Sequence, residues 1–171
     1  PGRLDEMKRQ LLIVEAIACH PTLNLILIGN ADTPYGDALR KRVQYLGLGD
    51  RILIKGFVSR KEKINLYANA LAIYNGPYEE DYGYVTLEGF FSSKPVISHT
   101  DSGGPLEFII DHENGFITEP SSKEIAAVLE ELTVQKARKL GNAGRQLMLD
   151  LDLNWNFIIN SLTLGKDRDY S

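Results

Sequence analysis

The chain has 171 residues, of which 43% are hydrophobic and 25% are charged, and its formal net charge at pH 7 is -4. A chain of this length and composition folds as a single globular domain that buries roughly two-thirds of its unfolded surface. We therefore expect one domain over residues 1–171. Because the net charge is negative, the chain lacks the basic surface that nucleic-acid binding requires, and we expect no nucleic-acid partner.

Helix and strand patterns alternate along the chain. Apolar residues recur at three- and four-residue intervals over residues 4–17, which predicts a first helix that ends at about His20. The apolar run 23–28 predicts a strand that is buried on both faces. The further predicted helices cover about 36–46, 60–69, 84–92, 105–110 and 121–150, and the further predicted strands cover 51–55, 71–74, 96–98 and 116–118. Residues 151–171 are expected to form a helical tail.

This alternation determines the fold class. Strands that are joined by helices of about ten residues need right-handed crossovers, which produce a parallel sheet covered on both faces. The sequence therefore predicts an α/β fold with a doubly wound, Rossmann-like parallel sheet. Ligands of such sheets bind beyond the carboxyl ends of the strands. We expect the site in the loops that follow Gly29, Lys55, Asn75 and Ser98.

The cellular setting is predicted from what the sequence lacks. Cys19 is the only cysteine, so no disulfide can form within the chain, and its apolar helical setting predicts a buried thiol. No stretch approaches the roughly 18 consecutive apolar residues of a membrane span, and the first residues do not resemble a signal peptide. We expect a cytoplasmic protein. Because Pro1-Gly2-Arg3 has no strand or cap before it, we also expect truncation at the amino end of a longer parent protein.

Two glutamates eight positions apart, Glu80 and Glu88, lie between the third predicted strand and the helix after it. If that helix begins near Gly83, the amides of Tyr84 and Val85 are unpaired donors at its positive end, where a phosphate can bind. The two carboxylates would then flank one ligand. Two alternatives stay open: the acidic run serves only the helix dipole, or Glu88 forms a structural ion pair.

Three motifs in this order resemble the signature of family 4 retaining glycosyltransferases, which have the GT-B fold. The motifs are Glu80-Asp81-Tyr82-Gly83-Tyr84-Val85-Thr86-Leu87-Glu88, Lys94-Pro95-Val96-Ile97 and Asp101-Ser102-Gly103-Gly104-Pro105-Leu106-Glu107. The family's basic pair is matched by Arg3 and Lys8, although Arg9 stands where a glycine usually follows the lysine. The resemblance covers about residues 2–160 and implies the carboxyl-terminal, nucleotide-sugar-binding half of a GT-B enzyme.

The resemblance implies a role for each matched residue. Arg3 and Lys8 would clamp the diphosphate, together with the helix amides near Gly83. Glu88 would accept hydrogen bonds from the ribose hydroxyls. Glu80 would orient a hydroxyl of the donor sugar and stabilise positive charge at the anomeric carbon.

Three further segments are candidate contacts. The resemblance implies that Gly56-Phe57-Val58 contacts the base, while a strand-end turn with Phe57 in the core is an equal alternative. It also implies that the loop with Gly103-Gly104 approaches the sugar or the acceptor. His99, at the carboxyl end of a predicted strand, is a further candidate for this contact.

The implied activity is retaining transfer of a hexose from a nucleoside-diphosphate sugar, without a cofactor or a metal, in polysaccharide or glycolipid biosynthesis. A missing amino-terminal domain would bind most of the acceptor, which could be a glycan, a lipid-linked sugar or a small molecule, and the parent could touch the inner face of a membrane. The isolated chain should therefore transfer little sugar. A non-catalytic nucleotide-sugar-binding module and a GT-B-fold epimerase or phosphorylase remain alternatives. The lack of a nearby histidine argues against a metal-dependent phosphohydrolase that uses residues 79–81.

Overall fold

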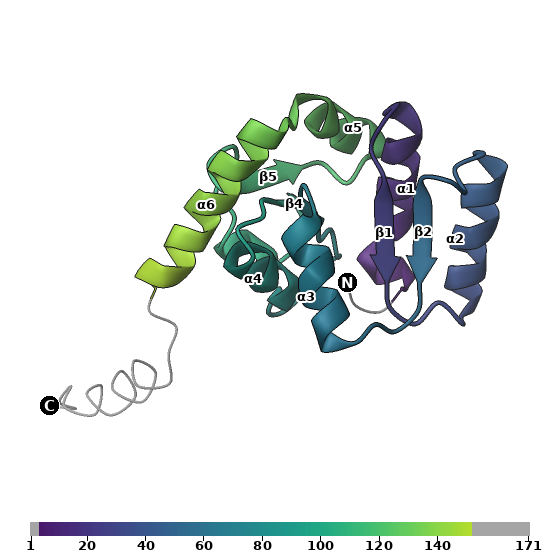
Figure 1. The fold of residues 1–171 in the computed structure, drawn as a ribbon, viewed down its shortest axis with the longest axis horizontal. Coiled ribbons are helices and arrows are strands. Elements are labelled where there is room, and N and C mark those ends of the chain that lie inside the picture. The colour runs from purple at the N-terminus through teal and green to yellow at the C-terminus, as the bar shows by residue number, and fades with distance from the viewer. Residues whose placement is uncertain (1–3, 152–171) are drawn as a thin grey trace, which may run out of the picture.

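The computed structural model describes residues 4–151, which alternate helices with parallel strands (Figure 1). Two short 3-10 helices carry the labels η1 and η2. In chain order the elements are η1 (Glu6–Lys8), α1 (Gln10–Cys19), β1 (Leu25–Ile28), α2 (Pro34–Tyr45), β2 (Ile52–Lys55), α3 (Arg60–Asn69), β3 (Ile73–Tyr74), α4 (Tyr84–Phe91), β4 (Val96–His99), η2 (Gly104–Glu107), β5 (Gly115–Thr118), α5 (Ser122–Glu131) and α6 (Val134–Asp150).

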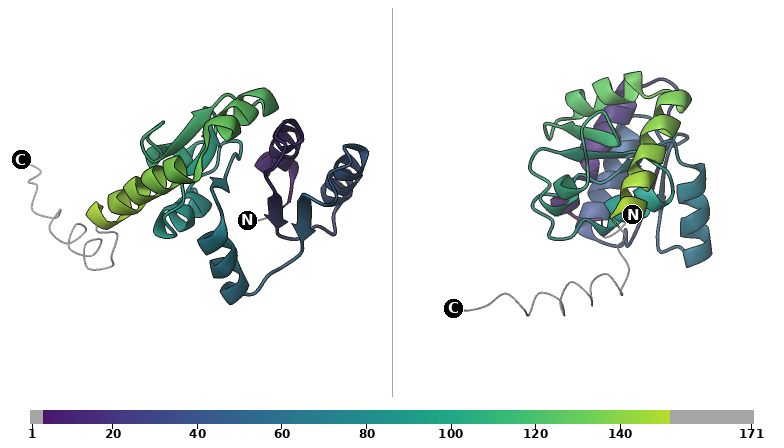
Figure 2. Two further views of the ribbon diagram at one scale, coloured as in Figure 1. Left: turned by 45° about the horizontal axis from the view of Figure 1, so that its top comes forward. Right: turned by 90° about the vertical axis from the view of Figure 1, so that its left-hand side faces the viewer.

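The strands form two parallel sheets. One sheet pairs β1 with β2, and the other has the order β3-β4-β5. The predicted α/β class with parallel strands is confirmed, but the single sheet that we expected is divided in two. Figure 2 shows the purple and blue elements α1, β1, β2 and α2 on one side of the molecule and the green elements β5 and α6 on the other.

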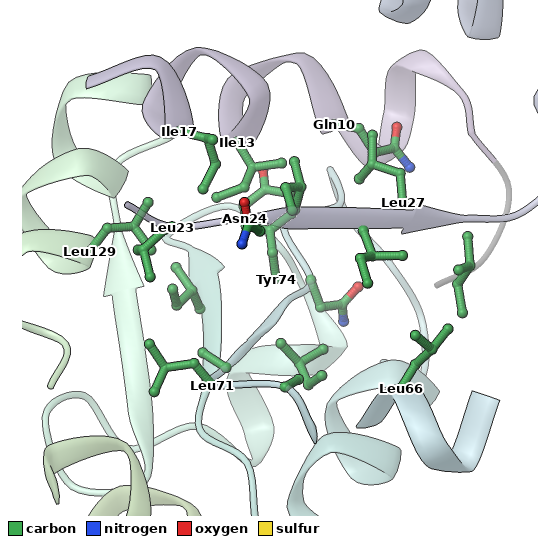
Figure 3. Close-up of a pocket in the computed structure, with 18 of the residues that line it drawn as sticks. Gln10, Ile13, Ile17, Leu23, Asn24, Leu27, Leu66, Leu71, Tyr74 and Leu129 are labelled. Atoms are coloured by element: carbon green, nitrogen blue, oxygen red, sulfur yellow. The ribbon is translucent and has the colours of Figure 1, made fainter. Parts of the chain in front are cut away.

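A cavity of about 470 Å³ separates the two sheets, and residues of both β1 and β3 line it. Ile13 and Leu27 border it on one side, and Leu66 and Leu71 lie on the opposite side (Figure 3). Within the described residues, β1 and β3 do not pair with each other. The local pattern of the sequence predicts each strand but not this separation of their edges.

Short-range chemistry explains where several helices begin. Thr33 accepts a hydrogen bond from Gly36 N at 3.0 Å, which caps α2, and Ser59 caps α3 in the same way. Thr133 caps α6, so the helix that we predicted over 121–150 is interrupted between α5 and α6. The predicted helix over 105–110 is only the short η2. The predicted tail over 151–171 lies outside the described residues, apart from Leu151.

The core is built mainly around α1, α5 and the three-stranded sheet, with Val14, Phe116 and Ile125 fully buried. Two burial predictions are wrong. Ile26 of β1 is 46% exposed, because one face of the two-stranded sheet is only partly covered. Cys19 is exposed, because the buried face of α1 does not extend to its last residue. None of the helices between residues 4 and 151 has both the length and the apolar character that spanning a membrane requires.

Candidate functional site

The loops that follow β3 and β4 lie side by side at the carboxyl edge of the three-stranded sheet. The main-chain N–H of Glu80 donates to Ser102 O at 3.0 Å, and Gly104 N donates to Glu80 O at 2.6 Å. Tyr78 N donates to Met7 O at 2.8 Å, so the segment before α1 also reaches this edge. Three segments that are distant in the sequence therefore meet where we expected the site.

Glycine is required where these loops touch. Gly83 precedes α4 with a φ of 60°, and a β-carbon there would lie 2.9 Å from Pro105 N. A β-carbon on Gly104 would lie 2.3 Å from Asp81 O, so any side chain would collide with main-chain atoms. Gly103 is exposed beside the loop that carries Glu80. The two glycines after β4 thus let this loop approach the loop with Glu80, and their contact with a sugar or acceptor stays a prediction.

Lys8 and Glu80 form an ion pair inside this site. Lys8 Nζ lies 2.5 Å from Glu80 Oε1, and the two side chains are 24% and 22% exposed. The second carboxylate oxygen, Glu80 Oε2, is buried and has no hydrogen-bond partner among the described residues. A buried carboxylate oxygen without a partner is costly, so this oxygen needs a hydrogen-bond donor. Arg3, the second predicted cation, lies outside the described residues.

The loop that carries Glu80 leads into the amino end of α4. Gly83 is its cap residue and makes no side-chain cap, so no side chain competes for the first main-chain N–H groups of Tyr84 and Val85. The exposed rings of Tyr82 and Tyr84 stack with their centroids 5.7 Å apart. The helix end therefore has no side-chain cap, and anion binding there stays a prediction.

Glu88 lies one turn further along α4 and faces α3. Lys63 Nζ lies 2.5 Å from Glu88 Oε1, and the Tyr67 hydroxyl donates to Oε2 at 2.9 Å. The pKa of this buried hydroxyl is raised by burial and by the charge of Glu88. The ion pair supports the structural alternative for Glu88, and contact with a ribose stays a prediction. Spacing in the sequence gave no indication of Lys63 or Tyr67 as its partners.

The segment Gly56-Phe57-Val58 lies at the carboxyl end of the two-stranded sheet, where Gly29 N donates to Gly56 O at 3.2 Å. Phe57 is 86% exposed, so the alternative that places this ring in the core is wrong. The exposed segment leaves base contact as a prediction.

His99 is completely buried beneath the two loops. Its Nε2 lies 2.9 Å from the Tyr74 hydroxyl, and its Nδ1 lies 3.0 Å from Thr118 Oγ1. Both ring nitrogens are therefore occupied by protein groups, and contact of His99 with a sugar stays a prediction. Burial, with a further contribution from the charge of Arg9, lowers the pKa of His99 to about 4.

This pKa predicts a pH dependence of stability. The unfolded chain takes up the histidine proton below about pH 6.5, whereas the folded chain resists it until about pH 4. Stability is therefore lost as the pH falls through this window, by about 2 kcal/mol between pH 7 and pH 5. Urea unfolding at both pH values should show this loss, and His99→Gln should abolish most of it. His112→Gln, at an exposed histidine, is the control and should keep the loss. An unchanged loss in His99→Gln would contradict the assignment.

The described part of the chain contains no group of three or more His, Cys, Asp or Glu side chains that could hold a metal ion. Of the acidic residues 79–81 that a metal-dependent phosphohydrolase would use, Glu80 is paired with Lys8.

Comparison with known proteins identifies relatives of the chain. Human alpha-1,3/1,6-mannosyltransferase ALG2 is 34% identical over 109 residues, which cover 63% of this chain and 26% of the human protein. The chain thus spans about a quarter of the length of this curated relative. The ALG2 protein of Dictyostelium discoideum is 28% identical over 114 residues, or 66% of this chain and 27% of that protein.

Solved structures show the same fold. Anabaena HepE in complex with UDP and glucose is 25% identical, with a TM-score of 0.82 over 95% of this chain and 47% of that chain. The profile of the family described as "Glycosyl transferases group 1" matches residues 1–147. With its parallel α/β fold and the loops assembled at the carboxyl edge of β3 and β4, the chain belongs to the group 1 glycosyltransferase family.

Proposed function

We propose that this chain is the donor-binding domain of a retaining, family 4 glycosyltransferase of the GT-B type, and that it binds a nucleoside-diphosphate sugar. The observation that carries the proposal is that the loop with Glu80, which pairs with Lys8, leads directly into the uncapped amino end of α4. A cation, free amides and an acceptor oxygen within one site match the chemistry of a phosphorylated sugar.

The diphosphate binds at the amino end of α4 in this proposal. The N–H groups of Tyr84 and Val85 donate to phosphate oxygens, and the helix dipole adds favourable potential. Lys8 supplies positive charge, and Arg3 is the proposed second cation. Because the charge of a diphosphate leaving group grows during transfer, these donors stabilise the transition state more than the bound donor.

The two glutamates serve different parts of the donor. The Glu80 carboxylate accepts a hydrogen bond from a sugar hydroxyl, and its negative charge stabilises the positive charge that develops at the anomeric carbon. Glu88 accepts from the ribose hydroxyls, because its side chain is 40% exposed and its carboxylate has lone pairs beyond those used by Lys63 and Tyr67. The exposed main chain of Gly56-Phe57-Val58 contacts the base.

The similar proteins support a hexose donor. The ALG2 proteins are named mannosyltransferases, and the HepE structure holds UDP and glucose. We propose that the parent transfers a hexose to a glycan, lipid-linked or small-molecule acceptor that an amino-terminal domain mainly binds. We further propose a role in polysaccharide or glycolipid synthesis in the cytoplasm, with peripheral membrane contact of the parent, and catalysis without a metal ion.

Thermal unfolding tests this proposal directly. UDP-glucose, GDP-mannose and ADP-glucose are each added to the chain at increasing concentration, and a ligand that binds the folded state raises the melting temperature. We expect one of the three to raise it by a few degrees at about ten times its dissociation constant, with or without EDTA. Free mannose and glucose are the controls and should have no effect. If none of the three nucleotides changes the melting temperature, or if EDTA abolishes the effect, the proposal is wrong.

Product analysis of the parent distinguishes the alternative enzymes. Transfer releases a free nucleoside diphosphate and produces a glycosylated acceptor, whereas epimerisation keeps the sugar attached to the nucleotide. A parent that binds the donor without any turnover would favour the non-catalytic module. The isolated chain should bind the donor but transfer little sugar, because the acceptor side is absent.

A further inference from the structure

The short segment that carries Lys8 is fixed to the loop after β3 through its main chain. Tyr78 N donates to Met7 O at 2.8 Å, and the Tyr74 hydroxyl donates to Arg9 O at 3.3 Å. The backbone is therefore held on both sides of Lys8. This explains how the ammonium group is aimed at the loop with Glu80, although η1 itself has only three residues.

The side chain of Arg9 connects this segment to both loops of the site. Its Nε donates to Gly76 O at 2.9 Å, and its Nη2 donates to Pro77 O at 2.5 Å. The same guanidinium group makes a bidentate contact with the Asp101 carboxylate: Nη1 donates to Oδ2 at 2.8 Å, and Nη2 donates to Oδ1 at 2.7 Å. Bidentate, charge-assisted contacts of this kind are among the strong hydrogen bonds of proteins. The Arg9 side chain is 17% exposed, so these contacts are largely shielded from water.

The backbone of Arg9 adopts a conformation that a residue with a side chain reaches only at a cost. Arg9 lies between η1 and α1 with a φ of 51° and a ψ of 35°, the left-handed conformation that favours glycine. A residue with a side chain is disfavoured in this conformation. The four hydrogen bonds of the guanidinium group offset that cost, and they converge on the two loops that form the candidate site.

We propose that Arg9 is a positioning residue of the donor site, which holds the Lys8 ammonium group against the Glu80 carboxylate by binding the loops after β3 and β4. Asp101 completes this clamp from the second loop. The importance of the clamp for donor binding rests on the proposed function, but the positioning of Lys8 can be measured without any nucleotide. Arg9 is not a catalytic residue, because it acts through Lys8.

The reactivity of Lys8 tests the positioning itself. Arg9→Gly keeps the left-handed backbone accessible and removes the clamp. We expect Lys8 of this variant to be acetylated by acetic anhydride about tenfold faster than in the unmodified chain, because the loss of strong hydrogen bonds frees its segment. Peptide mass spectrometry measures the rate against the exposed Lys123 of the same sample. An unchanged Lys8 rate in folded Arg9→Gly would overturn the proposal.

A second variant covers the case in which Arg9→Gly does not fold. Asp101→Asn removes the charged partner but leaves the contacts of Arg9 with Gly76 O and Pro77 O. It should accelerate acetylation of Lys8 in the same direction but by a smaller factor. If Arg9→Gly is unfolded and Asp101→Asn leaves the Lys8 rate unchanged, the proposal is overturned. The melting temperature of each variant shows which of them are folded.

Calorimetric titration with UDP-glucose and GDP-mannose tests the consequence for donor binding. Arg9→Gly should weaken binding of the preferred nucleotide about tenfold in the unmodified chain. In a chain that already carries Lys8→Met, the same substitution should weaken binding less than about twofold, because Arg9 affects the donor only through Lys8. A purely structural role predicts equal losses in the two backgrounds and would contradict the proposal. If the unmodified chain binds neither nucleotide nor ADP-glucose, the proposed function fails, while the acetylation rate of Lys8 still decides the role of Arg9.

Discussion

Glu80→Gln in the parent enzyme should lower kcat about 100- to 1000-fold while the dissociation constant of the donor stays within about threefold. The substitution keeps the shape of the side chain and removes its charge. The positive charge that develops at the anomeric carbon then loses its compensation. Donor binding should not weaken, because the contacts of Arg9 still hold the segment of Lys8 and the ammonium group keeps its charge for the diphosphate. Steady-state kinetics of the parent and calorimetry of the chain measure the two quantities.

The neighbouring glutamate supplies a matched control for this prediction. Glu79 is exposed and precedes Glu80 in the same loop. Glu79→Gln removes an equal charge from the same surface and should leave kcat within about threefold of the unmodified parent, since an exposed charge contributes little. Equal losses of kcat in the two variants, or a loss confined to donor binding in Glu80→Gln, would show that Glu80 does not act on the reacting sugar.

Glu88→Ala should weaken binding of the preferred nucleoside-diphosphate sugar by about 10- to 100-fold. A hydrogen bond to a charged group contributes roughly 1.5–3 kcal/mol, which corresponds to this range of dissociation constants. Turnover at saturating donor should change much less, because the ribose lies away from the reacting carbon. Calorimetric titration of the chain measures the affinity, and steady-state kinetics of the parent separates kcat from KM.

Lys63→Ala separates a ligand contact from a structural ion pair. It breaks the pair with Glu88 from the opposite end and leaves the carboxylate and its contact with Tyr67 in place. If Glu88 binds the ribose, Lys63→Ala leaves donor affinity within about threefold, whereas Glu88→Ala weakens it strongly. Equal weakening by both substitutions would assign Glu88 to the packing of α3 against α4 and remove it from the donor site.

Local features of the fold could be predicted from the sequence because they depend on neighbouring residues. The periodicity of apolar residues gave the helix–strand alternation, and the loop with Gly83 was located by its position between a strand and a helix. Gly83 and Gly104 are explained in the structure by close main-chain approaches to Pro105 and Asp81. Such approaches are consistent with the turns predicted at those glycines.

Long-range features could not be predicted in the same way. Lys8 and Glu80 are 72 positions apart, and only the family resemblance suggested that they share a site. The hydrogen-bonded ion pair of Arg9 and Asp101 joins residues 92 positions apart. The sequence indicates it only by an arginine at a position where the family usually has glycine. The separation of β1 from β3 by a cavity is a property of the assembled fold, which no local pattern of the sequence encodes.

A crystal structure of the chain with its preferred nucleoside diphosphate would test the central claim most directly. We expect phosphate oxygens within hydrogen-bond distance of the main-chain N–H groups of Tyr84 and Val85, with Lys8 Nζ directed at the same phosphates. The ribose should lie on the side of Glu88. A nucleotide that occupies the cavity between β1 and β3, or that leaves the amino end of α4 without a phosphate contact, would contradict the account.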